Sequence, residues 1–285
     1  MKKITIKARA KVNLSLIICS KIPDGFHEID TVMCPVDISD TVTIERRSDM
    51  NVFVNGVNIN AEDNTAFKAA RILMAEFDTQ GMDITIKKEI PMAAGLGGSS
   101  ADAAAVMLGF SKLFDIEQQK INFLAKKVGS DIPFMLQVKS GAMRARGVGD
   151  ILTEEEIEPL NVVIAKPDKG VITKDAYRLY DEMALPPSKE NNIALINALK
   201  NKEDICAYLI NDLFIPANKL NGEIEPLVKL MKKYNRNCAV MSGSGSAVAA
   251  ICDDADSAQK LLSKIPDNYY KIATTTALKA LEILE

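Results

Sequence analysis

The residues with the clearest chemical potential form a glycine-rich segment near the middle of the chain. Glycines let a backbone approach a ligand closely, and a helix that begins directly after them points free N–H groups at an anion. The pattern predicts a phosphate-binding loop; a turn that only caps a buried, alanine-rich helix is the alternative. The segment lacks the Lys-Ser/Thr end of a Walker A loop and does not match GxGxxG, which excludes both of those nucleotide-binding motifs. Its residues are Pro91, Met92, Ala93, Ala94, Gly95, Leu96, Gly97, Gly98, Ser99, Ser100 and Ala101.

A lysine and an asparagine stand two residues apart near the N-terminus, at Lys11 and Asn13. They lie in an alternating segment, so one strand face carries both, about 6.6 Å apart at a rise of about 3.3 Å per residue. A lysine on a strand whose opposite face is apolar is placed to reach a cleft. The competing interpretation is a solvated strand face, because Lys7 and Arg9 share that face.

Two further segments place polar groups at bends of the chain. Asp131 lies in residues 129–134, between the end of a predicted helix and an apolar run, where it could act as a base near a cation or cap the next turn. Gly243 and Ser244 lie in a small-residue loop, 242–246, that could approach a phosphate or form a tight hairpin. Neither segment decides between its two interpretations without the others.

Composition and charge narrow the class of protein. The chain has 285 residues, with 35 Lys+Arg against 38 Asp+Glu and a net charge of −3. This balance argues against a nucleic-acid-binding protein, which usually carries a basic excess. No apolar run approaches the roughly 18 residues that span a bilayer, and the basic start of the chain is unlike a signal peptide. We therefore expect no nucleic-acid or membrane partner and a cytoplasmic location, and the sequence does not indicate an oligomeric state.

The single histidine and the five cysteines limit the available chemistry. With His27 alone, multi-histidine zinc sites cannot be built, and a lone histidine in a turn is usually solvated. The cysteines contain no CxxC pair, so neither a disulfide framework nor a thiolate zinc site is predicted. We expect most of them to be small buried hydrophobes in a reducing compartment.

Alternating and helical patterns place these residues on elements. Polar turns around 154–159 form the best boundary between two halves, residues 1–158 and 159–285. The predicted fold class is α+β, with a cleft between the halves. Strands are expected at 4–19, 31–36, 41–45, 51–54, 83–88, 162–165, 238–241, 247–252 and 270–275, and helices after Asn64 and at 101–114, 118–128, 173–183, 193–199, 223–234 and 254–264.

Taken in order along the chain, these segments resemble the GHMP kinases, the family of galactokinase, homoserine kinase, mevalonate kinase and phosphomevalonate kinase. The resemblance covers nearly the whole chain, with motifs at residues 11–14, 91–102 and 241–246. It implies a two-domain GHMP-kinase fold, with an N-terminal half like the second domain of ribosomal protein S5 and a ferredoxin-like C-terminal half. It also implies ATP and Mg²⁺ as cofactors, with the glycine-rich loop and Asn64 on the ATP and Ser99 or Ser100 near the metal; for Asn64, a plain helix cap is an equal alternative.

Within that family, five segments are similar to the branch that phosphorylates a cytidyl-diphosphate methylerythritol in the non-mevalonate route to isoprenoid precursors. They include residues 10–14, the turn Pro23-Asp24-Gly25 with Phe26 and His27 after it, and residues 129–134 and 147–152. By similarity, Asp131 is the base that accepts the hydroxyl proton and Lys11 is its electrostatic partner. Phe26, His27 and Tyr177 would hold the cytosine, while Asn13, Gly243 and Ser244 would contact the rest of this small-molecule substrate.

Three positions depart from that branch. Ser99 stands where a third glycine is common, Phe26 replaces a common tyrosine, and Ala247 follows the third motif where threonine is common. None of them touches the expected catalytic pair. Two other functions stay open at the level of sequence, namely another small-molecule GHMP kinase of the homoserine or mevalonate type and a catalytically inactive, ligand-sensing relative.

Overall fold

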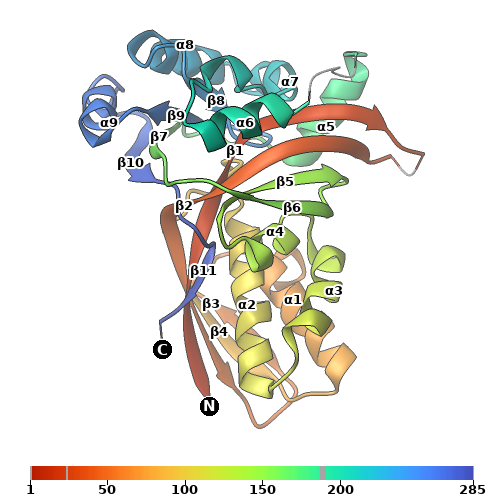
Figure 1. Cartoon of the computed structure of the whole chain (residues 1–285). Coiled ribbons are helices and arrows are strands. Elements are labelled where there is room, and N and C mark those ends of the chain that lie inside the picture. The colour runs from red at the N-terminus through yellow and green to blue at the C-terminus, as the bar shows by residue number, and fades with distance from the viewer. Residues whose placement is uncertain (1, 24, 187–190, 285) are drawn as a thin grey trace.

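The structure is a computed structural model that describes residues 2–23, 25–186 and 191–284. Two antiparallel-rich sheets form its halves, and one long hairpin runs from the first half into the second (Figure 1). The strands are β1 (Lys3–Lys21), β2 (His27–Arg46), β3 (Val52–Asn55), β4 (Met82–Lys87), β5 (Gly141–Gly147), β6 (Ile151–Glu156), β7 (Asn161–Lys166), β8 (Ala239–Met241), β9 (Val248–Cys252), β10 (Tyr270–Thr275) and β11 (Leu281–Ile283). The helices are η1 (Ala61–Asp63), α1 (Thr65–Phe77), α2 (Gly98–Phe114), α3 (Gln118–Val128), α4 (Ile132–Gln137), α5 (Thr173–Glu182), α6 (Ile193–Asn201), η2 (Cys206–Tyr208), α7 (Phe214–Leu220), α8 (Ile224–Tyr234) and α9 (Ala255–Leu262).

The first strand shows how a polar face can become buried. From Ile4 to Ala10 its side chains alternate between buried and half-exposed, as the period of two requires. From Lys11 to Ile18 both faces are buried, because this part of the strand lies where the second half of the chain covers it. The polar face predicted from the sequence is therefore confirmed as a face, while its second part is enclosed rather than solvated.

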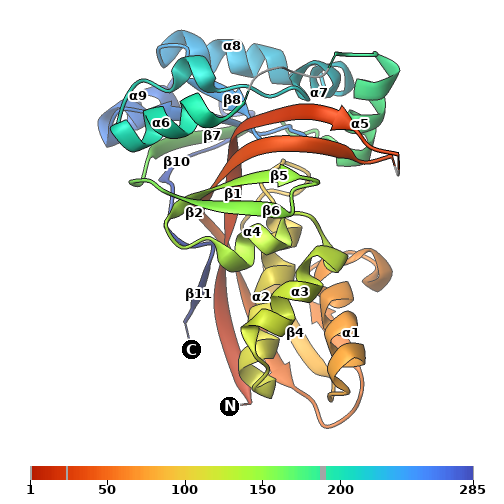
Figure 2. The same ribbon diagram turned by 45° about the vertical axis from the view of Figure 1, so that its right-hand side comes forward.

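The N-terminal half packs helices onto one side of a sheet ordered β11-β1-β2-β4-β3, with β5 and β6 continuing from β2 among the described residues. Helix α2 lies along this sheet with α1 and α3 beside it (Figure 2). Its alanines and Gly109 are small, so the helix axis can approach β1 and β2 closely. This packing fixes the start of α2, and with it the glycine-rich loop, relative to β1.

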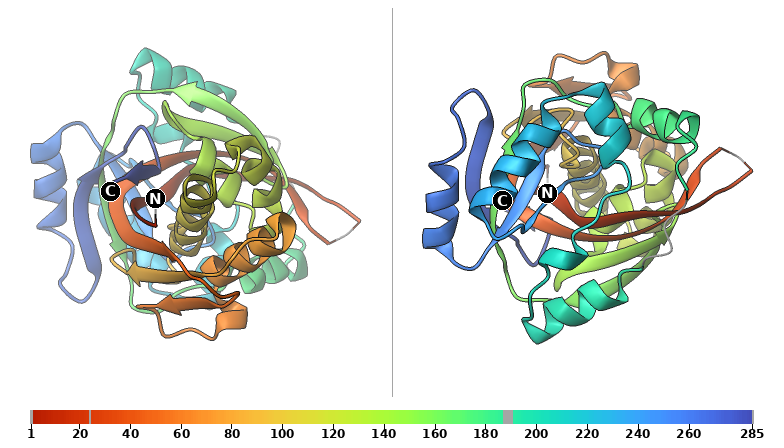
Figure 3. Two further views of the ribbon diagram at one scale, coloured as in Figure 1. Left: turned by 90° about the horizontal axis from the view of Figure 1, so that it is seen from below. Right: turned by 90° about the horizontal axis from the view of Figure 1, so that it is seen from above.

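The C-terminal half is built on the sheet β10-β7-β9-β8. Helix α8 shows the pattern that holds its helices down: Leu227, Val228 and Met231 are buried, and the lysines between and after them face solvent. Figure 3 shows helices of this half over the sheet when the molecule is viewed from above. The loop after β8 and the start of α5 both reach the N-terminal half.

Several elements differ from the sequence prediction. The strands expected at 31–36 and 41–45 are one continuous strand, β2, because both parts pair with β1 across small register shifts. Residues 154–156 are not a turn but the end of β6, whose exposed glutamates hid its pairing with β5. Residues 132–137 form a helix, and β11 returns to pair with β1, which brings the two ends of the chain together (Figure 3). The division at 158/159 stays a prediction.

The cysteines also differ from expectation, since the structure joins Cys206 and Cys238 in a disulfide with a Cα–Cα distance of 4.4 Å. The two residues are 32 positions apart in the sequence, too far for any spacing signal. Cys34 and Cys252 are buried as predicted, while Cys19 is exposed. In the parts of the chain described here, no helix is both long and apolar enough to cross a membrane.

The two halves are held together where the glycine-rich loop meets the loop after β8. The amide of Ala247 donates to the carbonyl of Ala94 at 2.9 Å. The Ser242 hydroxyl accepts a hydrogen bond from the main-chain amide of Asn13 at 3.1 Å and donates one to the Gly95 carbonyl at 3.0 Å. A side chain at Gly95 is forbidden twice over, because its φ is +75° and a Cβ there would lie 2.1 Å from the Ser242 carbonyl oxygen.

We therefore predict that Gly95→Ala lowers the free energy of unfolding by on the order of 2–4 kcal/mol, through left-handed strain and a clash with fixed backbone. Gly222→Ala is the matched control, since a Cβ there meets nothing within 4 Å. The control should change stability by less than about 0.5 kcal/mol. Urea unfolding of both variants is the measurement, and equal stabilities would contradict the proposed tight contact.

Candidate active site

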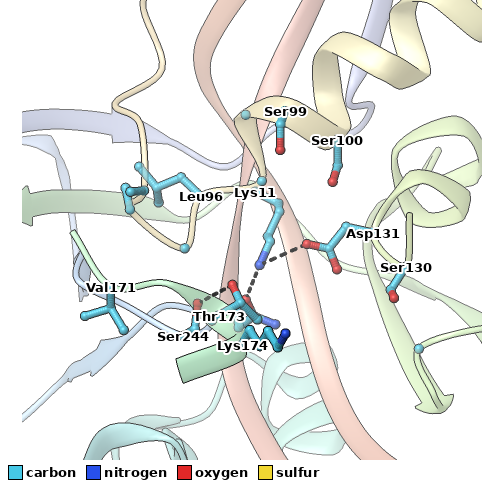
Figure 4. A pocket seen from close by; sticks show the side chains of 18 of the residues that line it. Lys11, Leu96, Ser99, Ser100, Ser130, Asp131, Val171, Thr173, Lys174 and Ser244 are labelled. Carbon is cyan, nitrogen blue, oxygen red and sulfur yellow. Dashed lines mark hydrogen bonds and ion pairs between the residues drawn. The ribbon is translucent and has the colours of Figure 1, made fainter. Parts of the chain in front are cut away.

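A cavity of about 1080 Å³ lies between the two halves. Cavities that bind small ligands are usually about 300–1,000 Å³, so this one is at the large end of that range. Residues from β1, the glycine-rich loop, α5 and the loop after β8 line it. Figure 4 shows Lys11 among these side chains, with Asp131 to its right and Thr173 and Ser244 below it.

Lys11 lies at the centre of this cavity and is almost completely buried. Its Nζ is 3.4 Å from Asp131 Oδ2 and donates a hydrogen bond of 2.6 Å to Asn13 Oδ1. Asp131 stands at the N-terminus of α4, yet its side chain does not cap that helix. The alternative in which Asp131 is only a helix cap is therefore wrong, and the carboxylate faces the lysine across the cavity (Figure 4).

The glycine-rich loop forms one wall of the cavity. Helix α2 begins at Gly98, so the N–H groups of residues 98–100 have no acceptor within the helix. The amide of Ala101 already donates to the Gly97 carbonyl at 2.9 Å, and its side chain is buried outside the cavity lining. The other ten residues expected to bind nucleotide in this segment all line the cavity: Pro91, Met92, Ala93, Ala94, Gly95, Leu96, Gly97, Gly98, Ser99 and Ser100.

The loop after β8 faces the same space. A Cβ on Gly243 would lie 3.2 Å from Lys11 Nζ, so this glycine leaves room next to the lysine. The Ser244 hydroxyl is 2.8 Å from the hydroxyl of Thr173, the first residue of α5. Asn211 holds the loop in place by donating to the carbonyls of Met241 and Gly243 at 2.6 and 2.8 Å.

His27 and Tyr177 come together at the far end of the cavity. Their rings stack with centroids 5.0 Å apart and 28° between planes. His27 Nε2 lies 2.8 Å from Asp181 Oδ1, and although burial raises the pKa of Asp181, its hydrogen bonds with Lys21 and His27 lower that pKa overall. Burial raises the pKa of Tyr177, and the negative charge of Asp131 adds to that rise.

Phe26 also lines the cavity and is 62% exposed, so its ring is presented to the open end. Asp24 of the same predicted turn lies outside the described residues. Asn64 lies at another edge of the cavity, where its side-chain oxygen accepts from the amides of Ala66 and Phe67. The helix-cap interpretation of Asn64 is confirmed, and only its Nδ2 is left to meet a ligand.

A buried charge cluster beneath the loop was missed in the sequence. Lys88 Nζ lies between Asp40 and Asp102, 2.8 Å from Asp102 Oδ2. Asp40 also accepts from the amides of Glu89 and Ile90 at 2.6 and 2.9 Å, whereas Asp102 Oδ1 is buried without a hydrogen-bond partner. Burial raises the pKa of Asp102 to about 7 despite Lys88, and the charge of Asp40 adds to the rise. The sequence signal for this charge cluster was that Lys88 and Asp102 flank the predicted glycine-rich loop.

Oxygen donors near the loop fit a magnesium ion. The hydroxyls of Ser99 and Ser100 lie at the start of α2, on the side where Asp131 stands (Figure 4). Mg²⁺ is usually held by one or two carboxylates together with substrate phosphates, so this donor set is suitable for it. Another group with metal-binding side chains, Asp204, Cys206 and Cys238, is remote from the cavity and contains the disulfide.

Comparisons with protein families match both halves of this fold. The model of the GHMP kinases N terminal domain matches residues 64–138, and that of the GHMP kinases C terminal domain matches residues 188–271. A homoserine kinase structure from Cytophaga hutchinsonii superposes with a TM-score of 0.76 over 100% of this chain and 98% of its own, at 18% identity, which supports the fold alone. The chain is a GHMP kinase, and the two-domain α+β fold expected from the sequence is confirmed.

Relatives with higher sequence identity show which branch of the GHMP kinases the chain belongs to. A 4-diphosphocytidyl-2-C-methyl-D-erythritol kinase from Thermoanaerobacter pseudethanolicus is 34% identical over 100% of both chains. The enzyme of the same name from Alkaliphilus metalliredigens is 36% identical over 88% of each chain. A crystal structure of 4-(cytidine 5'-diphospho)-2C-methyl-D-erythritol kinase superposes with a TM-score of 0.81 at 29% identity, covering 95% of this chain and 98% of its own. The chain belongs to the 4-diphosphocytidyl-2-C-methyl-D-erythritol kinase family.

The charge cluster predicts a pH dependence of stability. The folded protein keeps a proton on Asp102 up to about pH 7, whereas an unfolded aspartate loses its proton near pH 4. The contribution of Asp102 to the free energy of unfolding is therefore lost as the pH rises through 7. Asp102→Asn removes the titration. From pH 5 to pH 8 we expect the variant to gain on the order of 2 kcal/mol relative to the parent in urea unfolding. Asp63→Asn, at an exposed carboxyl on η1, is the control. Parallel curves for Asp102→Asn and the parent would contradict the prediction.

Proposed function

We propose that this protein transfers the γ-phosphoryl group of ATP to the 2-hydroxyl of 4-diphosphocytidyl-2-C-methyl-D-erythritol, a step of the non-mevalonate route to isoprenoid precursors. The observation that carries the proposal is the Lys11–Asp131 pair, 3.4 Å apart beside the glycine-rich loop. A carboxylate and a buried cation facing one cavity are the groups that a hydroxyl nucleophile needs. The family named above supplies the identity of the substrate.

In this proposal Asp131 accepts the proton of the attacking hydroxyl. The hydroxyl oxygen then forms its bond to the γ-phosphorus while the bond from that phosphorus to the bridging oxygen breaks and ADP leaves. Lys11 Nζ lies between the carboxylate and the loop, where its charge stabilises the alkoxide that develops and the oxygens of the transferred group. Phosphoryl transfer depends mainly on positioning and electrostatics, so a small set of groups is sufficient.

The phosphates of ATP would rest on the free N–H groups of residues 98–100 and on the positive end of α2. Bound Mg²⁺ would neutralise charge on these phosphates, with Ser99 or Ser100 beside it. Asn64 Nδ2 would meet the adenosine, because the side-chain oxygen is already used by helix α1. Ala101 supports the loop from below rather than touching the nucleotide.

The cytosine would lie at the far end of the cavity. Phe26 and Tyr177 offer aromatic faces there, and His27 offers a hydrogen-bonding ring between them and Asp181. Asn13, Gly243 and Ser244 would hold the diphosphate and the acceptor alcohol near Lys11. The ligands in this proposal are small molecules. The balanced charge of the chain gives no indication of a nucleic-acid or membrane partner.

The direct test measures ADP release with Mg·ATP and four acceptors: 4-diphosphocytidyl-2-C-methyl-D-erythritol, methylerythritol phosphate, mevalonate and homoserine. We expect turnover with the cytidyl compound alone. Asp131→Asn is the matched variant; it keeps the shape of the side chain and should lower kcat by roughly 10²–10⁴-fold with little change in ATP affinity. Turnover only with mevalonate or homoserine would contradict the substrate, and ATP binding without any turnover would favour a ligand-sensing protein.

Base recognition can be tested separately from chemistry. His27→Ala should raise the KM for the cytidyl substrate about tenfold or more, because it removes a buried hydrogen-bonding ring at the predicted cytosine site. The kcat at saturation and the KM for ATP should change little, since His27 is not part of the Lys11–Asp131 pair. An unchanged KM for the cytidyl substrate would show that the base is recognised elsewhere.

A further inference from the structure

We propose that Thr31, a residue of β2 with no assigned role, is a positioning residue for the transfer reaction: its hydroxyl fixes the orientation of the Asn13 amide and thereby the direction of the Lys11 ammonium. This inference rests on the proposed function, because it takes Lys11 and Asp131 as the reacting pair. It concerns what holds that pair in place, which neither the sequence motifs nor the family comparisons address.

An unbroken chain of hydrogen bonds joins Thr31 to the lysine. Lys11 Nζ donates to Asn13 Oδ1 at 2.6 Å, and Asn13 Nδ2 donates to Thr31 Oγ1 at 2.8 Å. Thr31 Oγ1 in turn donates to the main-chain carbonyl of Ser15. All three side chains are buried, with exposed fractions of 4% for Lys11, 3% for Asn13 and 1% for Thr31.

The direction of this chain follows from the chemistry of its two ends. The Ser15 carbonyl can only accept, so the single hydrogen of the Thr31 hydroxyl must point to it. Thr31 Oγ1 is then an acceptor toward Asn13, which turns the NH₂ end of the amide to the threonine and the oxygen to the lysine. The ammonium of Lys11 can only donate, so it requires the same orientation. Both ends of the chain therefore require the same orientation of the Asn13 side-chain amide, and only this orientation satisfies all of these hydrogen bonds.

The strand geometry puts Thr31 within reach. The β1–β2 register shifts between Asn13 and Ser15, so that Thr31 pairs with Leu16 while Met33 pairs with Asn13. This irregularity carries the Thr31 hydroxyl to the Ser15 carbonyl. At the same place the Val32 amide donates to the Ser15 hydroxyl at 3.3 Å, so Ser15 contacts β2 through both its side chain and its carbonyl.

The consequence for Lys11 is steric as well as electrostatic. Its stem is confined by the backbone of Gly97, where an added Cβ would lie 2.9 Å from Lys11 Cγ. The stem is therefore fixed by packing, and the terminal ammonium is directed by its hydrogen bond to Asn13 Oδ1 and by its ion pair with Asp131 Oδ2. A reversed Asn13 amide would present N–H groups to the ammonium and push it away from its position beside Asp131.

The experiment compares Thr31→Val, which keeps the shape and removes the hydroxyl, with Thr31→Ser, which keeps the hydroxyl. We expect kcat to fall at least tenfold in Thr31→Val, with the KM for ATP within about threefold, and kcat to return to within about threefold of the parent in Thr31→Ser. Thr276→Val is the matched control. Thr276 is also a buried threonine whose hydroxyl bonds the main chain, by accepting from the Leu160 amide at 2.8 Å, and it lies outside the cavity lining. Its variant should keep the parental kcat.

A second readout addresses the amide directly and does not require turnover. The side-chain NH₂ of Asn13 should exchange slowly with solvent in the parent protein by NMR and much faster in Thr31→Val. Parental kcat in Thr31→Val, or a fast-exchanging Asn13 NH₂ in the parent, would overturn the inference. If the parent phosphorylates no acceptor, the proposed function fails, while the exchange of the Asn13 amide still tests the hydrogen-bond chain. If Thr31→Val does not fold, Thr31→Ala and the parental exchange rate provide the test.

Discussion

The structure depends on one constraint, which is that the ammonium of Lys11 must be kept inside the protein. A buried charge is costly unless hydrogen bonds and an opposite charge accompany it. Asn13 and Asp131 supply these partners, and the open cavity leaves the remaining side of the ammonium to the phosphates of the ligand. The long β1–β2 hairpin places the lysine between the two halves, where it is almost completely buried and its charge acts more strongly than in bulk water.

The second half of the chain is needed because it closes this site. The loop after β8 contributes the Ser242 hydroxyl, which bridges the amide of Asn13 and the carbonyl of Gly95. One side chain thereby holds the lysine strand, the phosphate loop and the C-terminal half in a fixed relation. A second link between the halves lies at His27 of β2, whose ring contacts Asp181 and Tyr177 of α5.

The charge cluster beneath the glycine-rich loop affects the potential at the proposed phosphate site. Two carboxylates, Asp40 and Asp102, share the single cation Lys88 below the glycine-rich loop. Because burial raises the pKa of Asp102 to about 7, this cluster carries less negative charge next to the phosphates than its composition suggests. Local pairing, rather than overall charge, therefore sets the potential that an anionic ligand meets.

The sequence by itself determined the elements whose signals are local: the alternating strand with Lys11 and Asn13 on one face, the glycine-rich loop that opens a helix, and the α+β class. Tertiary structure decided the features that depend on residues far apart. The hydrogen bond from Asn13 to Thr31 crosses 18 positions, the disulfide joins residues 32 apart, and β11 pairs with β1 across almost the whole chain. Strand β6 escaped prediction because its run of three glutamates is typical of a polar turn, whereas its backbone pairs with β5 and Glu155 is buried beside Lys200. Spacing reports which residues share a face, whereas burial and hydrogen-bond direction arise only when distant segments pack together.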